Sequence, residues 1–100
     1  MLVDGAHAPG MLADGVDALG ADFWTGNFHK WVCAPKGSGA LVVRAEHRDH
    51  VHPLITSHGM GQGFRAEFDW TGTKDDTACL AVPQAVAFMA ELGWDRKSVV

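Results

Sequence analysis

The run Met1-Leu2-Val3-Asp4 is the strongest indication of the fold class, because it joins a short apolar segment to a polar residue at its end. Such a run is typical of a buried strand in a parallel sheet, where both faces are covered. In open α/β sheets, ligands collect at the carboxyl ends of the strands. The sequence therefore predicts an α/β fold with Asp4 at the ligand-binding edge of the sheet.

Two more strands are expected further along the chain. Residues 23–28 are aromatic and β-branched enough for a short strand that leads to Lys30. The run Ala40-Leu41-Val42-Val43 follows the glycine turn Gly37-Ser38-Gly39 and predicts another strand. Both expectations place Lys30 in the connection between two strands.

Helical patterns lie in two places. Residues 14–19 have weak helical spacing and stop at Gly20, whereas residues 77–92 form the best helix, with Asp75 or Asp76 as its cap and Gly93 as its end. Pro83 either kinks this helix or starts a second one. The helix also carries Cys79, which we expect in the core, and an apolar stripe formed by Leu80, Val82, Val86, Met89 and Leu92.

Composition excludes several classes of function. The net charge is −4, without a cluster of Lys and Arg, which argues against a nucleic-acid surface. No apolar run approaches the ~20 residues that span a bilayer, and the start lacks the pattern of a secretory signal. Cys33 and Cys79 are far apart, which is typical of reduced thiols, so we expect a cytoplasmic protein.

Lys30 is the residue best suited to covalent chemistry. It lies in the segment Asn27-Phe28-His29-Lys30-Trp31, downstream of the strand-end Asp4. Lysine forms Schiff bases with carbonyl compounds, and an Asp beside a pyridinium nitrogen makes that ring an electron sink. The pair therefore suits pyridoxal 5'-phosphate, although an arbitrary lysine of this kind is most often only a surface side chain.

Four blocks in order resemble the class V aminotransferase family of pyridoxal phosphate-dependent enzymes (fold type I), and the isopenicillin N epimerase-like branch is the most similar. The blocks are residues 3–10 (VDGAHAPG), 20–23 leading into His29-Lys30-Trp31, 35–43, and 67–75 (EFDWTGTKD). The resemblance implies an α/β, aminotransferase-like large domain with a mostly parallel sheet and flanking helices. It also implies that residues 1–100 are a fragment, the middle to later portion of that domain.

The resemblance also implies roles for individual residues. Lys30 would form the Schiff base and move protons at the substrate α-carbon. Asp4 would hold the pyridine nitrogen protonated, and His7 would reach the phenolic oxygen of the cofactor. The phosphate would be bound by Asn27 and His29, and by Gly72 and Thr73 reaching the neighbouring protomer of a homodimer.

The implied activity is that of an enzyme acting at the α-carbon of an amino acid or aminoacyl substrate, as an epimerase, aminotransferase or C–S lyase. We expect the isolated fragment to be inactive. The alternative is a non-catalytic, truncated relic or a subunit fragment that needs another chain. Desulfurase activity has no support, because neither cysteine matches the position of the persulfide cysteine in the desulfurase relatives.

Histidines gather in the charged segment after the last strand and suggest a metal site as a weaker alternative. Their spacing lacks the helical i, i+4 pairing of a metalloprotease, and no cysteine is near. A solvated turn or short helix over residues 45–53 is the better interpretation, so no metal is expected. The residues concerned are His47, His50, His52 and His58.

Overall fold

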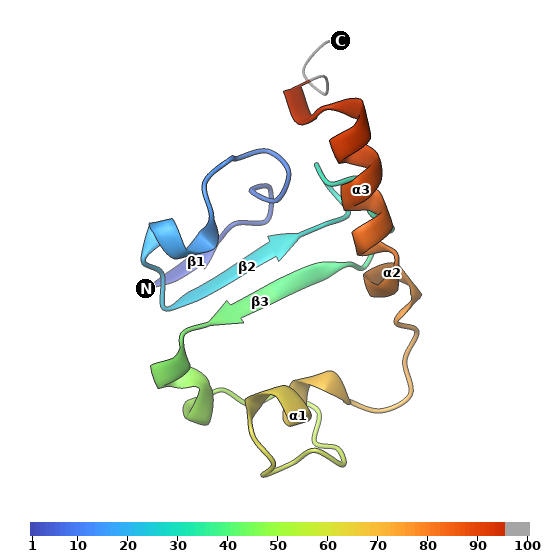
Figure 1. Cartoon of the computed structure of the whole chain (residues 1–100). Coiled ribbons are helices and arrows are strands. Elements are labelled where there is room, and N and C mark those ends of the chain that lie inside the picture. Colours follow the sequence, from blue (N-terminus) through green and yellow to red (C-terminus); the bar gives the residue numbers. More distant parts are fainter. Residues whose placement is uncertain (96–100) are drawn as a thin grey trace. The chain divides into compact units, whose positions relative to one another are not determined.

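The computed structural model of the chain describes residues 1–95, so the last five positions of the predicted 1–100 domain lie outside the described residues (Figure 1). The chain contains both strands and helices, as expected for an α/β protein. In chain order they are β1 (Leu2–Asp4), the 3₁₀ helix η1 (Val16–Leu19), β2 (Phe23–Asn27), β3 (Gly39–Val43), the 3₁₀ helix η2 (Ala45–His50), α1 (Phe64–Asp69), α2 (Thr77–Leu80) and α3 (Val82–Leu92).

The sheet has the order β1-β2-β3 within the described residues. β1 pairs with β2 in parallel, with Val3 opposite Trp24 and Asp4 opposite Thr25. This confirms the α/β fold and the parallel pairing of the first two strands. The arrows of β2 and β3 point in opposite directions in Figure 1, so the described part of the sheet is mixed.

β1 is less covered than its sequence predicts. Leu2 is 68% exposed and Val3 is half-buried, so the expectation of a buried strand is wrong here. The physical reason is position: within residues 1–95, β1 is the outer strand of the sheet, with β2 as its only neighbour. The buried apolar side chains of the sheet are instead Trp24 on β2, which is 5% exposed, and Val43 on β3, which is 2% exposed.

The indole of Trp24 packs against the backbone of two glycines, Gly5 and Gly26. A Cβ added at Gly5 would collide with the indole of Trp24, and so would one added at Gly26. Gly5 donates its amide hydrogen to the carbonyl of Thr25 at 2.8 Å, which holds the end of β1 against β2. Glycine at these two positions lets a large aromatic side chain lie over the strand ends.

The helical region after residue 76 follows the second of the two expectations for Pro83. α2 ends at Leu80, and α3 starts at Val82 with Pro83 in its first turn, where a missing N–H costs no hydrogen bond. Gly93 follows α3 with a φ of 85°, which confirms the predicted stop. Asp76 occupies the N-cap position of α2, but within the described residues its side chain makes no capping hydrogen bond.

Three details of this region and its neighbours differ from the sequence expectations. Cys79 is exposed, so its predicted place in the core is wrong: the break at residue 81 leaves α2 a single turn. From the apolar stripe, Met89 is buried at 4% exposure whereas Leu80 is 77% exposed. Helix α1 was not predicted; its Phe64 and Phe68 rings, one helical turn apart, lie with their centroids 4.7 Å from each other.

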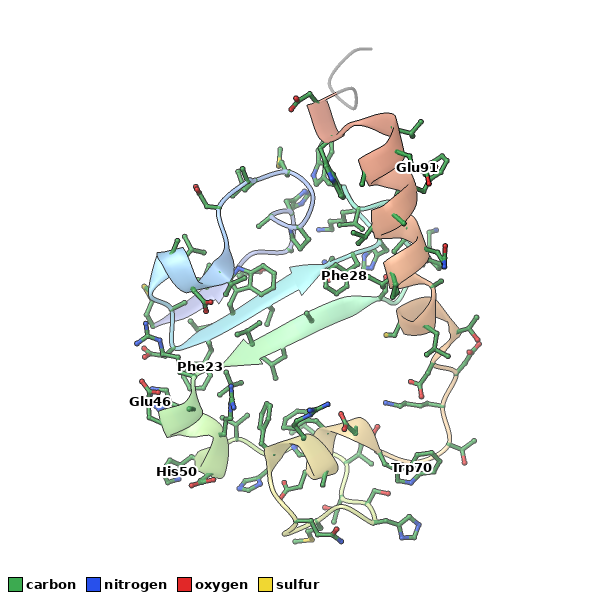
Figure 2. The ribbon with its side chains drawn as sticks, in the orientation of Figure 1. Phe23, Phe28, Glu46, His50, Trp70 and Glu91 are labelled. Atoms are coloured by element: carbon green, nitrogen blue, oxygen red, sulfur yellow. The ribbon has the colours of Figure 1, made fainter. Side chains whose placement is uncertain are left out.

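The chain divides into two compact units. The first consists of Met1–Val42 and Asp76–Val100, and the second of Val43–Asp75. In the second unit, Glu46 and His50 of η2 and Trp70 after α1 point outward (Figure 2). η2 matches the short helix that was one of the two alternatives for residues 45–53.

Candidate active site

The parallel pairing of β1 and β2 brings two predicted site residues, Asp4 and Lys30, to the same edge of the sheet. β1 ends at Asp4, opposite Thr25, and β2 runs on to Asn27 before the chain turns. Two backbone hydrogen bonds close this turn, from the Cys33 amide to the Lys30 carbonyl at 3.1 Å and from the Ala34 amide to the Phe28 carbonyl at 3.0 Å. Lys30 therefore lies on a constrained turn at the carboxyl end of the strand.

A hollow of about 630 Å³ lies at this edge of the first unit. We call it the strand-end hollow. Its polar lining includes Asp4, His7 and Lys30, while Trp24, Met11 and Leu12 contribute apolar surface. The hollow thus combines a carboxylate, an imidazole and a primary amine against an apolar wall.

His7 is the centre of the polar contacts. Its Nε2 lies 3.1 Å from Nζ of Lys30, and its Nδ1 accepts the indole N–H of Trp31 at 3.3 Å. The turn after His7 lies close to the same segment, since a Cβ at Gly10 would be 3.0 Å from the carbonyl carbon of Trp31. Gly10 has a φ of +76°, in the left-handed region that glycine adopts without strain.

Asp4 is fixed by its own turn. Its Oδ1 accepts the amide hydrogen of Ala6 at 3.1 Å, a local bond typical of aspartate at the start of a turn. The carboxylate stays at the surface of the strand-end hollow. This position suits a group that pairs with a cationic or protonated ligand atom.

The residues predicted to bind phosphate are not among those that line the strand-end hollow in the described part of the chain. Two of these residues are Asn27 and His29. Nδ1 of His29 donates to the carbonyl of Ser38 at 3.0 Å, because a carbonyl can only accept. Gly72 and Thr73 lie in the segment between α1 and α2, in the second unit.

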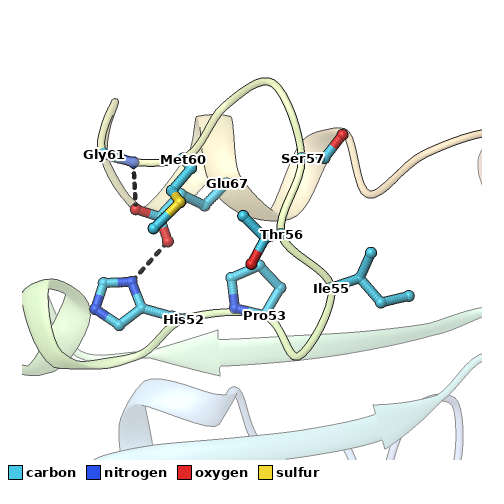
Figure 3. Close-up of a pocket in the computed structure, with 8 residues that line it drawn as sticks. All are labelled: His52, Pro53, Ile55, Thr56, Ser57, Met60, Gly61 and Glu67. Atoms are coloured by element: carbon cyan, nitrogen blue, oxygen red, sulfur yellow. Dashed lines mark hydrogen bonds and ion pairs between the residues drawn. The ribbon is translucent and has the colours of Figure 1, made fainter.

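The second unit contains a smaller cavity of about 240 Å³ that sequence analysis did not identify (Figure 3). Its wall includes the buried Glu67, which accepts hydrogen bonds from Nδ1 of His52 at 2.6 Å and from the Gly61 amide at 3.1 Å. The bond from His52 and then that from Gly61 hold the pKa of Glu67 below its usual value, against the opposing effect of burial. A histidine that the metal hypothesis would use as a ligand is therefore engaged by a carboxylate.

Comparison with known proteins decides the family. The model of "Aminotransferase class-V" matches residues 1–96. The chain belongs to the class V aminotransferase family. The family resemblance drawn from the four sequence blocks is thereby confirmed.

Relatives in the family carry names from two kinds of chemistry. A putative L-cysteine desulfhydrase 1 of Oryza sativa subsp. japonica is 35% identical over 91 residues, covering 89% of this chain and 19% of the relative. The isopenicillin N epimerase of Streptomyces clavuligerus is 33% identical over 109 residues, covering 92% of this chain and 27% of the relative. This chain therefore spans about a fifth to a quarter of the length of these relatives.

A solved structure agrees with the fold. The apo structure of a cysteine desulfurase from Thermococcus onnurineus NA1 matches 95% of this chain and 26% of its own chain, with a TM-score of 0.75 and 25% identity. The expected α/β, aminotransferase-like fold is thereby confirmed. Within residues 1–95, no helix has the length and apolar character needed to cross a membrane.

Proposed function

We propose that this chain belongs to a pyridoxal phosphate-dependent enzyme that acts at the α-carbon of an amino acid or aminoacyl substrate, with Lys30 as the lysine that carries the cofactor. The observation that carries the proposal is the joint lining of one hollow by Asp4, His7 and Lys30 at the carboxyl ends of paired parallel strands. Membership of the class V family supports the same cofactor.

The donor set of the strand-end hollow fits one end of the cofactor. When bound, pyridoxal phosphate supplies an aldehyde that condenses with amines and a pyridinium ring that accepts electrons from a substrate carbon. Lys30 would provide the amine, and Asp4 would hold the proton on the ring nitrogen through a charge-assisted hydrogen bond. His7 would donate from Nε2 to the phenolic oxygen, and the wall formed by Trp24 would exclude water.

We assign the phosphate to residues outside the strand-end hollow. Asn27 and His29 would approach it from the end of β2. Because Nδ1 of His29 already donates to Ser38, only Nε2 is left, and it donates only when the ring is protonated. Gly72 and Thr73 would serve the neighbouring protomer of a homodimer.

Lys30 would then act on the substrate itself. Its Nζ is the base that removes a proton from the substrate α-carbon and the acid that returns it. Return of the proton by Lys30 would restore the same configuration. Delivery of a proton to the opposite face by a second acid would give an epimerase, whereas loss of a substituent from the β-carbon would give a C–S lyase. The relatives named for L-cysteine desulfhydrase and isopenicillin N epimerase favour these two outcomes over transamination.

We place the protein in the cytoplasm.

The first test is covalent capture of the cofactor. The 100-residue chain is mixed with pyridoxal phosphate and reduced with borohydride, and the added mass is located by peptide mapping. We expect stoichiometric labelling at Lys30 that is lost in Lys30→Ala and kept in Lys36→Ala, since Lys36 is an exposed lysine on the next turn. Labelling spread over several lysines, unchanged in Lys30→Ala, would contradict the proposed site.

The second candidate function is a non-catalytic one. The chain would hold part of the site and would need another chain before it could convert a substrate. It is favoured by the separation of Asn27 and His29 from the strand-end hollow. Exchange of the α-proton of added amino acids in heavy water, followed by NMR with cofactor present, separates the two candidates. Labelling at Lys30 without exchange would favour the incomplete site, whereas exchange that depends on Lys30 would favour the enzyme.

A further inference from the structure

The cavity of the second unit has a mostly apolar wall. Pro53, Ile55 and Met60 contribute apolar side chains to it, and Thr56 contributes a hydroxyl group. We call it the Glu67 cavity, after the only carboxylate among the described residues that line it. Its volume of about 240 Å³ lies below the roughly 300 Å³ at which pockets for drug-sized ligands begin. The Glu67 cavity therefore suits a molecule of only a few heavy atoms.

The carboxylate of Glu67 is held in the wall and has room for a further partner. Its Oε2 accepts the Nδ1–H of His52 at 2.6 Å, and its Oε1 accepts the Gly61 amide hydrogen at 3.1 Å (Figure 3). An ionised carboxylate offers about four lone-pair positions, so in the described part of the chain each oxygen can accept one more hydrogen bond. Glu67 is 8% exposed, whereas the side chain of His52 is 60% exposed. The imidazole therefore faces water, and the carboxylate is the charge that the cavity presents.

The lining offers no lysine or arginine to pair with this charge. Among the described residues that line the Glu67 cavity, none carries an ammonium or a guanidinium group. The bond from His52 holds the pKa of Glu67 below its usual value, against the opposing effect of burial, so the carboxylate is ionised at neutral pH. Buried charges in proteins are stabilised by a partner of opposite charge. The Glu67 cavity is therefore complementary to a small cation.

We propose that the Glu67 cavity binds a small primary ammonium ion that carries a short alkyl chain. The ammonium group has three N–H donors, which suit the remaining lone pairs of Glu67 and the hydroxyl of Thr56. The alkyl chain would lie against Pro53, Ile55 and Met60, and its transfer from water to this apolar wall adds to the affinity. All these residues belong to the second unit, so the site does not depend on the proposed function of the strand-end hollow.

The loop that forms the cavity is preorganised. Gly59 lies so close to α1 that a Cβ there would collide with the carbonyl of Ala66. The Met60 amide donates to the Ser57 carbonyl at 3.1 Å, and the Gln62 amide donates to the Gly59 carbonyl at 3.0 Å. A site that already has its shape loses less conformational freedom when a ligand binds. We therefore expect the ammonium ion to bind without a change in the fold of the second unit.

Titration of the 100-residue chain with n-butylammonium chloride tests the proposal. Amide NMR at constant ionic strength follows the signal of Gly61, whose N–H donates to Glu67. The titration is run at about pH 7.5, where a primary alkylamine stays protonated as lysine does. The matched ligand controls are n-butanol, which is neutral and has the same chain length, and sodium butyrate, which is an anion.

We expect n-butylammonium to shift the Gly61 signal in a saturable way. Its affinity should be about tenfold higher than that of n-butanol, the ratio expected between a hydrogen bond to a charged group and one between neutral groups. Butyrate should not bind. Glu67→Gln should abolish the preference for the ammonium ion, whereas Glu46→Gln, at an exposed carboxylate in the same unit, should keep it.

A second pair of variants covers the case in which Glu67→Gln does not fold. Met60 lines the cavity but is 69% exposed, so we expect Met60→Ala to keep the fold. Loss of its side chain from the wall should weaken the binding of both n-butylammonium and n-butanol about threefold. Leu54→Ala, at a fully exposed leucine that is not among the described residues lining the cavity, should leave both affinities unchanged.

Equal affinities for n-butylammonium and n-butanol would overturn the proposal, because the carboxylate would then not select the ligand. A folded Glu67→Gln chain that still prefers the ammonium ion would also overturn it. So would a Met60→Ala chain that binds n-butylammonium as tightly as the wild type. Signal shifts spread over both units would count against the proposal as well, because they indicate adsorption to the surface instead of binding in the Glu67 cavity.

Discussion

Gly5 has no side chain, and the indole of Trp24 occupies the space where one would lie. We expect Gly5→Ala to destabilise the chain by about 1–3 kcal/mol, the usual cost of forcing an extra carbon into a packed site. Urea unfolding followed by circular dichroism measures this change.

Gly15→Ala is the matched control for that substitution. A Cβ at Gly15 meets no atom within 4 Å, and the residue has a φ of −70°, which alanine adopts readily. We expect its free energy of unfolding to stay within about 0.5 kcal/mol of the wild type. Equal losses in the two variants would show that Trp24 does not fill the space above Gly5.

Glu67 makes stability depend on pH, because its hydrogen bonds to His52 and Gly61 hold its pKa below the ordinary value of 4.5. A lowered pKa in the folded state stabilises the fold above the unfolded pKa, and this contribution is lost as the pH falls through the folded value. We expect Glu67→Gln to be less stable than the wild type at neutral pH, with the difference shrinking below pH 4.5. Thermal unfolding at a series of pH values measures it.

Glu46→Gln is the matched control for the Glu67 substitution. Glu46 lies in the same unit and is exposed, with an Oε1 that is 3.8 Å from Nη1 of Arg44. Exposed ion pairs of this kind contribute little to stability. A pH-dependent loss of the same size in both variants would contradict the special role of the bond between His52 and Glu67.

At the scale of elements, α3 is held by one buried residue. Met89 is 4% exposed whereas Val86, three positions earlier, is 42% exposed. We expect Met89→Ala to lower the free energy of unfolding by about 2–5 kcal/mol, as for other buried methionines, and Val86→Ala to change it by less than about 0.5 kcal/mol. Chemical denaturation of the two variants side by side checks this. Similar losses would mean that α3 packs through more of its apolar stripe.

The elements differ in how far sequence could predict them. β2 and β3 were predicted within a residue or two, because short apolar runs bounded by turn residues have few alternatives. α1 was missed because it is only six residues long and follows a glycine-rich stretch. Cys79 was placed in the core because its neighbours are apolar, but a single helical turn does not enforce burial.

The sequence predicted individual residues of the candidate site, but not the contacts between distant segments. Asp4 and Lys30 followed from strand ends, lysine chemistry and the family resemblance, and both line the strand-end hollow. The bond from Trp31 to His7 could not be predicted, because it depends on how two loops distant in sequence approach each other. The pair of His52 and Glu67 was missed for the same reason.

On the scale of the whole molecule, much apolar surface faces solvent. Leu2 on the outer strand is 68% exposed, Leu54 is fully exposed and Leu80 is 77% exposed. Exposed strand edges and apolar patches favour pairing between chains. We expect the 100-residue chain to self-associate, with sedimentation coefficients that rise with concentration, and Leu2→Lys to weaken this association. A single monomeric species at every concentration would contradict the prediction.

The connection between β1 and β2 has an engineering consequence. His7 and Lys30 are held by the strand register and by two local turns, while Ala13, Asp14 and Gly15 between them are exposed or face open space. The length of this connection can therefore vary without moving either residue. A short epitope or fluorescent reporter inserted after Asp14 should be tolerated there, and it would give a tag close to the strand-end hollow that leaves the paired strands in register.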